Sequence, residues 1–230
     1  MTNPIFVAID TPYLDDALEL TRRIRGQVGG IKLGLEFFCA NGHHGVHEVQ
    51  KLGLPIFLDL KLHDIPNTVS AAVTSVAHLS PKFLTIHASG GSAMIKAASE
   101  AAPDISITAV TILTSLSDDD LKEIGYAQDS ANSAAALAKL ASQNGARSIV
   151  CSPFEASKIR NVVGSKVEII TPGVRPEGAE LGDQKRVMTP REAMTSGANY
   201  LVIGRPITDQ SKISLDSMKK ISASILDSLN

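Results

Sequence analysis

Two charged side chains interrupt an apolar segment that has the composition of a buried strand, and a third follows it. The segment Ile56–Lys61 contains Asp59 and Lys61, and Asp64 follows just beyond its end. Residues two apart on a strand project from the same face, so this carboxylate and this ammonium should lie together. Because a buried charge without a partner is costly, the alternating signs predict a preformed ion network. A purely structural salt bridge is the alternative for the pair taken alone.

A second lysine, Lys32, stands between Ile31 and Leu33 in another short apolar segment. It is either a surface lysine whose aliphatic stem covers apolar area or a member of the same network. Further candidates end or follow other predicted strands, namely Asp10, His87, Thr114, Ser115, Thr171, Gly204 and Arg205. In barrels of parallel strands, chemistry occurs where strands end and loops begin. The convergence of so many such groups therefore indicates an enzyme.

Short apolar segments alternate with helical patterns along all 230 residues. The predicted strands are Ile5–Asp10, Gly30–Leu33, Ile56–Lys61, Phe83–His87, Ser106–Thr111, Ser148–Cys151, Glu168–Thr171 and Tyr200–Ile203. The predicted helices are Leu14–Arg25, Glu36–Leu52, Asn67–Leu79, an alanine-rich stretch after Gly91, Asp118–Ile124, Ala131–Asn144, Phe154–Val163, Pro190–Ser196 and Ser214–Leu229. Eight strand–helix units predict an α/β fold, a single (β/α)8 TIM barrel over residues 1–230. An open doubly wound sheet is the alternative, but no Gly-x-Gly-x-x-Gly follows the first strand.

The composition argues against several classes of protein. The net charge is −2 and 43% of the residues are hydrophobic, so we expect a sizeable core and no broad surface for nucleic acid or anionic membranes. Neither an apolar span of about 18 residues nor a basic-then-apolar leader occurs, so we expect a soluble cytoplasmic protein. Cys39 and Cys151 lie far apart in apolar surroundings, which predicts buried, reduced thiols.

Two segments near the C-terminus could bind an anion. Gly204 allows the backbone to approach a ligand closely, and Arg205 beside it can clamp a phosphate with two hydrogen bonds. A tight turn with a surface arginine is the alternative. The long Gly/Pro-rich stretch from Thr171 could act as a lid, with Arg175 and Gln184 closing over a phosphate. An ordinary surface loop is the alternative there.

Two other charged or ligating groups are interpreted as structural. His43 and His47 have the i,i+4 spacing of some metal sites, and His44 lies between them. Because no cysteine or third-ligand pattern accompanies them, we interpret all three as solvated helix residues and expect no metal. The run Asp118–Asp120 stands at a predicted helix start, where acidic residues complement the helix dipole.

Beyond these local patterns, the chain resembles the orotidine 5′-phosphate decarboxylase family, and its bacterial members in particular. The resemblance rests on Asp59-x-Lys61-x-x-Asp64 followed by Ile65-Pro66-Asn67-Thr68, with support from Val7–Asp10, Lys32–Gly34, His87–Gly91, Thr171–Pro176 and Ile203–Pro206. It covers nearly the whole chain. It implies decarboxylation of orotidine 5′-monophosphate (OMP) to UMP, the last step of UMP synthesis, without a cofactor.

The resemblance also implies the roles of individual residues. Lys32, Asp59, Lys61 and Asp64 would form the catalytic Lys-Asp-Lys-Asp array, with Lys61 as the proton donor at C6. Asp64 would reach into the neighbouring subunit's site, which implies a homodimer. The other implied substrate contacts are Asp10, Asp64 and Thr68 at the ribose, Thr114 at the pyrimidine, and Arg175, Gln184, Gly204 and Arg205 at the phosphate.

Two alternatives stay open at this point. A related barrel family of metal-dependent decarboxylases and hexulose-phosphate synthases shares the Asp-x-Lys-x-x-Asp run, but resembles this chain less at position 32, where those enzymes place a glutamate metal ligand. A non-catalytic nucleotide-binding barrel is the other. It would have no need of both Lys32 and Lys61.

Overall fold

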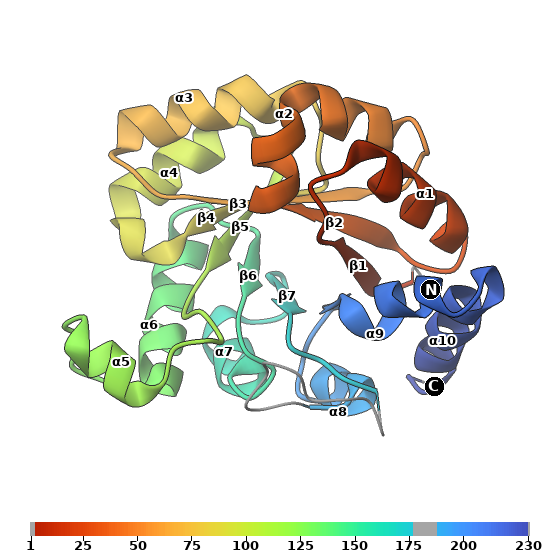
Figure 1. Ribbon diagram of the computed structural model, residues 1–230. Helices are drawn as coiled ribbons and strands as arrows, with labels where there is room; N and C mark the ends of the chain where they lie inside the picture. Colours follow the sequence, from red (N-terminus) through yellow and green to blue (C-terminus); the bar gives the residue numbers. More distant parts are fainter. Residues whose placement is uncertain (1–2, 177–187, 230) are drawn as a thin grey trace.

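The strands form the centre of the molecule and the helices surround them (Figure 1). The computed structural model describes residues 3–176 and 188–229, and in this part of the chain eight parallel strands close into a barrel in sequence order. The strands are β1 (Ile5–Ile9), β2 (Gly30–Gly34), β3 (Ile56–Leu62), β4 (Phe83–His87), β5 (Ser106–Val110), β6 (Ser148–Val150), β7 (Glu168–Thr171) and β8 (Tyr200–Ile203). The predicted (β/α)8 barrel is confirmed.

Helices follow the strands as predicted. They are α1 (Leu14–Ile24), α2 (Leu35–Gln50), α3 (Pro66–Ala77), α4 (Gly91–Ala101), α5 (Asp118–Glu123), α6 (Ser130–Gln143), α7 (Ala156–Val163), α8 (Pro190–Thr195), α9 (Arg205–Thr208) and α10 (Leu215–Asp227). The sequence pattern missed α9 and the single 3₁₀ turns Ala88–Gly90 and Asp209–Lys212. These pieces are too short for a periodic apolar face. Asp118–Asp120 does form the first turn of α5, with Ser117 and Asp120 in a capping box.

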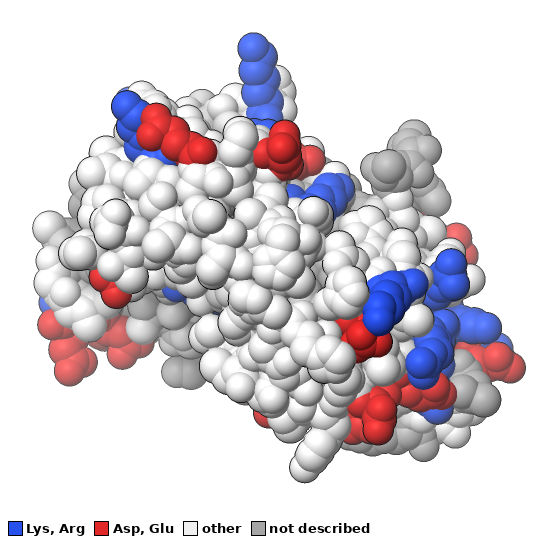
Figure 2. Space-filling model, turned by 90° about the horizontal axis from the view of Figure 1, so that it is seen from above, with Lys and Arg blue, Asp and Glu red and all other residues white. Residues whose placement is uncertain are grey.

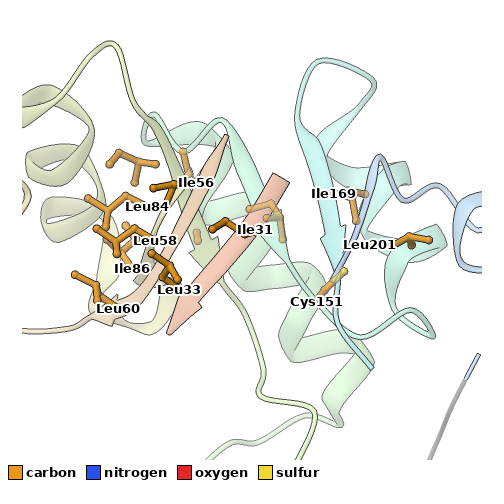
Figure 3. Close-up of a cluster of buried hydrophobic side chains, with 14 of the residues drawn as sticks. Ile31, Leu33, Ile56, Leu58, Leu60, Leu84, Ile86, Cys151, Ile169 and Leu201 are labelled. Carbon is orange, nitrogen blue, oxygen red and sulfur yellow. The ribbon is translucent and has the colours of Figure 1, made fainter. Parts of the chain in front are cut away.

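The period of two along β3 divides its side chains between two cores. Leu58 and Leu60 point outward and pack with Leu33 and Ile86 beneath the helices (Figure 3). Phe57 points inward and joins a separate cluster with Phe6, Phe83 and Tyr200. The rings of Phe57 and Phe83 meet edge to face with centroids 5.5 Å apart. This aromatic layer fills the barrel, so Asp59, which shares the inward face, lies next to it.

The prediction that both cysteines are buried is wrong for Cys39. Cys151 is buried, but Cys39 is exposed. The buried face of α2 is formed by Phe37, Gly45, Val46 and Val49, and the helix is kinked at Gly42. A residue two positions after Phe37 lies on the opposite side of the helix, so Cys39 points to solvent.

Charges of both signs are interspersed on the surface. On the face seen in Figure 2, basic and acidic side chains lie near one another at the margins and form no large area of one sign. Within residues 3–176 and 188–229, no helix combines the length and the apolar character required to span a membrane.

Candidate active site

One carboxylate holds two lysines at the carboxyl end of the first three strands. The Lys61 ammonium donates to both oxygens of Asp59, at 2.9 and 2.8 Å. The Lys32 ammonium, on β2, lies 3.6 Å from Asp59 Oδ2 and 3.2 Å from Oδ1 of Asp10, the residue after β1. These contacts make Lys32 a member of the network. It is not a surface lysine, because only 13% of its side chain is exposed. The predicted ion network thus extends from Asp10 to Lys61 across three adjacent strands.

Asp59 is ionised although it is buried. Burial by itself would raise the pKa of this carboxyl group, but the positive charges of Lys32 and Lys61 oppose that effect. Hydrogen bonds from Lys61 and from Thr85 act in the same direction, and the net result is a pKa below the ordinary value. The site therefore contains one carboxylate with its negative charge fixed between two cations.

Thr85 on β4 is a part of the site that the sequence reasoning missed. Its hydroxyl donates to Asp59 Oδ1 at 3.0 Å and accepts from the backbone N–H of Lys61 at 2.8 Å. Lys61 itself has a φ of 49°, in the left-handed region that non-glycine residues seldom occupy. The only sequence signal for Thr85 was a hydroxyl within the apolar strand Phe83–His87.

Asp64 lies apart from the other charges in a single chain. It is exposed, and its Oδ1 accepts a hydrogen bond from the N–H of Ile65 at 2.6 Å. In the described part of the chain it forms no ion pair with Lys32 or Lys61. Thr68 is also exposed, in the first turn of α3, a helix that begins with Pro66. The structure thus brings Asp10, rather than Asp64, to the lysines of the same chain.

A cavity of about 230 Å³ opens beside the network. Its charged side is formed by Lys32, Asp59 and Lys61, and Thr114 lies on its wall. The remaining lining is largely apolar and comprises Phe57, Val110, Ile112, Leu113, Ser115, Val150, Cys151, Pro172 and Val202. A largely apolar wall with one convergent charged group is typical of a small-molecule site.

The predicted anion-binding residues lie at the ends of β7 and β8. Gly204 follows β8 and lies against the end of β1, because a Cβ placed on it would be 3.4 Å from the Cβ of Ala8 and 3.8 Å from Asp10 Oδ2. Arg205 begins α9 and is exposed, whereas Arg175 is 8% exposed and its backbone N–H donates to the carbonyl of Met188. Gln184 lies outside the described residues.

Two histidines lie near the network. His87 ends β4, and its ring centroid is 5.5 Å from that of His63. Burial lowers the pKa of His87, and the nearby His63 and Lys61 lower it further. A neutral imidazole thus stands near the cationic side of the site at pH 7.

The other histidine group lies elsewhere. The ring centroids of His43 and His78 are 5.1 Å apart. His44 and His47 are exposed on α2. No group of three or more His, Cys, Asp or Glu residues among those described could hold a metal ion.

Comparison with known proteins gives a consistent result. The model of the family described as "Orotidine 5'-phosphate decarboxylase / HUMPS family" matches residues 3–215. A protein of Sphingopyxis alaskensis named orotidine 5'-phosphate decarboxylase is 54% identical over 212 residues, which cover 92% of this chain and 94% of that protein. A protein of the same name from Novosphingobium aromaticivorans is 53% identical over 209 residues, covering 90% and 93%. The crystal structure of orotidine 5'-phosphate decarboxylase from Lactobacillus acidophilus superposes with a TM-score of 0.81 at 34% identity, over 99% of both chains.

Proposed function

Because this chain belongs to the orotidine 5′-phosphate decarboxylase / HUMPS family, we propose that it converts OMP to UMP and CO2 in pyrimidine biosynthesis in the cytoplasm. The observation that carries the proposal is the contact of one ionised carboxylate, Asp59, with two ammonium groups at the edge of a small cavity. No covalent intermediate with the protein is needed, and the reaction requires charge placed in advance.

The chemistry explains why two lysines suit this site. Loss of CO2 from C6 of the pyrimidine leaves an sp² carbanion with no adjacent carbonyl group to accept its charge. An ammonium group fixed beside C6 stabilises that charge as it develops and then donates a proton to the carbon. We assign this role to Lys61, which lines the cavity and whose ammonium is held by both oxygens of Asp59.

Asp59 and Lys32 keep the donor in place. With its low pKa, Asp59 stays charged and so holds the ammonium of Lys61 in place through two hydrogen bonds. Lys32 bridges Asp59 and Asp10, which ties the network to β1. The reacting carboxylate of OMP would face Asp59 and be neutralised by the two ammonium groups.

The rest of the substrate would be bound around this centre. We place the ribose hydroxyls at Asp10 and Thr68 and the pyrimidine at Thr114, which lines the same cavity. The phosphate would lie at Gly204, Arg205, Arg175 and Gln184. The proximity of Gly204 to Asp10 supports this arrangement, because it places the proposed phosphate and ribose contacts side by side. Binding energy from the phosphate can then support catalysis at the ring.

We propose that the active unit is a homodimer in which each site receives Asp64 from the partner subunit. In its own chain Asp64 is exposed and accepts a hydrogen bond from the amide of Ile65. Large apolar side chains are exposed after three neighbouring strands, with exposed fractions of 68% for Tyr13, 50% for Leu35 and 67% for Ile65. An exposed apolar area next to a charged site is typical of an interface.

The metal-dependent branch of the family is the second candidate. Lys32 argues against it, because its half-buried ammonium, 3.6 Å from Asp59, places a positive charge where a metal ion would need an anionic ligand. The decisive experiment measures UMP release from OMP by the purified protein with and without EDTA. We expect full activity in EDTA. Strong dependence on added divalent metal would favour the metal-dependent branch, and UMP binding with no turnover would indicate a nucleotide-binding protein.

A further inference from the structure

The hydroxyl of Thr85, on β4, bonds to two residues of the neighbouring strand β3, Asp59 and Lys61. Thr85 is fully buried on β4. Its Oγ1 accepts from the Lys61 backbone N–H at 2.8 Å and donates to Asp59 Oδ1 at 3.0 Å. A hydroxyl has a single hydrogen, so donation to the carboxylate leaves its lone pairs for the amide.

The backbone of Lys61 needs such a contact. The register between β3 and β4 shifts between Leu58 and Leu62, so the ladder is irregular where Lys61 lies. Within this irregularity Lys61 adopts a φ of 49°, which is unfavourable for a residue with a side chain. Its amide donates a hydrogen bond to the hydroxyl of Thr85. The hydroxyl of Thr85 therefore gives the Lys61 amide a hydrogen-bond acceptor at the point where the pairing of β3 with β4 is irregular.

We propose that Thr85 is a positioning residue that fixes the Lys61 backbone and the Asp59 carboxylate relative to each other, so that the ammonium is aimed into the cavity. The role assigned to Thr85 rests on the proposed decarboxylase function. Thr85 acts through its two neighbours, because it is not among the residues that line the cavity. Its loss should therefore affect turnover more than substrate binding.

The adjacent strand offers a matched control. Thr108 on β5 is the direct register partner of Thr85 and is also fully buried. Its hydroxyl bonds to the Ser106 carbonyl and the Ser148 hydroxyl, and these contacts involve neither lysine of the network. Replacement of either threonine by valine removes one buried hydroxyl at nearly constant volume. Only the Thr85 change should disturb Lys61.

The test compares kcat and KM for OMP in the wild type and in Thr85→Val, Thr85→Ser and Thr108→Val. We expect Thr85→Val to lower kcat by roughly 10- to 100-fold, the factor typical of leaving buried polar groups unpaired. We expect KM to stay within about threefold, since Thr85 does not touch the substrate cavity. Thr85→Ser keeps the hydroxyl and should restore most of kcat, and Thr108→Val should resemble the wild type. Equal kcat values for the two valine variants would overturn the proposal.

Crystal structures of the same variants provide a readout independent of turnover. In Thr85→Val, Lys61 should leave the left-handed conformation or its ammonium should leave Asp59, and in Thr108→Val neither should change. If the wild type releases no UMP, the proposed function fails while this geometric test of Thr85 still stands. Should Thr85→Val not fold, Thr85→Cys keeps a side chain of similar size with a weak donor. A kcat for Thr85→Cys equal to that of Thr85→Ser would then count against the proposal.

Discussion

The Lys32 ammonium lies 3.6 Å from the Asp59 carboxylate, although the two residues belong to adjacent strands of the barrel. The same carboxylate holds Lys61 at 2.8 Å. Asp59 is thus shared by two cations that would otherwise repel each other. Because the loss of one partner of a buried ion pair leaves an uncompensated charge, each member of the network has a distinct and measurable effect.

Replacement of Lys61 by alanine should abolish useful turnover. General acid catalysis alone contributes roughly 10²- to 10⁴-fold, and charge stabilisation adds to it. We therefore expect kcat for OMP to fall by at least about 10³-fold in Lys61→Ala, measured as UMP formed. Lys96→Ala, at an exposed position on α4, is the control and should keep wild-type activity. A Lys61→Ala enzyme within tenfold of wild type would disprove the assigned role.

Asp59 should stabilise the folded protein at neutral pH and lose this effect in acid. Its folded-state pKa lies below the ordinary value of 3.8, so its contribution is complete above that pH and declines as the pH falls through the folded pKa. Asp59→Asn should lower the free energy of unfolding by roughly 1–3 kcal/mol at pH 7. The difference from wild type should shrink below about pH 4.

Denaturant titrations at several pH values would measure this difference. Asp104→Asn, at an exposed position in the loop before β5, should change the free energy of unfolding by less than about 0.5 kcal/mol. A gap between wild type and Asp59→Asn that is independent of pH would contradict the assignment.

His87 should titrate below its ordinary pKa of 6.5, because burial, His63 and Lys61 all disfavour its protonated form. The unfolded chain then binds more protons, so His87 makes the protein less stable as the pH falls from about 6.5 through the folded pKa. NMR titration of the His87 Cε1–H resonance should show a higher pKa in Lys61→Ala than in wild type, because one nearby positive charge is lost. The Lys96→Ala control should leave the titration unchanged, and an identical curve in Lys61→Ala would refute the coupling.

Subunit complementation tests the sharing of Asp64. Lys61→Ala and Asp64→Ala should each be nearly inactive alone. When the two variants are mixed and exchange subunits, half of the dimers contain one chain of each. One of the two sites in such a dimer has both Lys61 and Asp64. About a quarter of the wild-type activity should therefore return. The control mixes Lys61→Ala with Asp59→Asn, two changes within one chain's network, and should recover nothing. Failure of the first mixture, with exchange of subunits demonstrated, would argue that Asp64 serves its own chain.

Much of the site followed from local sequence. The period of two along Ile56–Leu62 placed Asp59 and Lys61 on one face, and the structure confirms that Leu58 and Leu60 lie on the other. The alternation of strand and helix patterns predicted the barrel, and the barrel predicted that polar residues after the strands share one end. These inferences need only the geometry of a single strand and the shared direction of parallel strands.

Other features depended on contacts between distant segments. The pairing of Lys32 with Asp10 joins residues on different strands, and the hydroxyl of Thr85 reaches two residues of β3. The exposure of Cys39 depended on which face of α2 the barrel covers. The local sequence pattern predicts the face on which a side chain lies, but it does not predict which distant residues that side chain contacts.

The sequence by itself determined the residue types, the face on which each lies and the end of the barrel at which they gather. The tertiary structure alone decided that Lys32 meets both Asp10 and Asp59 and that Lys61 occupies a left-handed conformation supported by Thr85. The physical reason is that strand geometry is set by neighbouring residues, whereas the closure and register of the barrel are set by the packing of the whole chain.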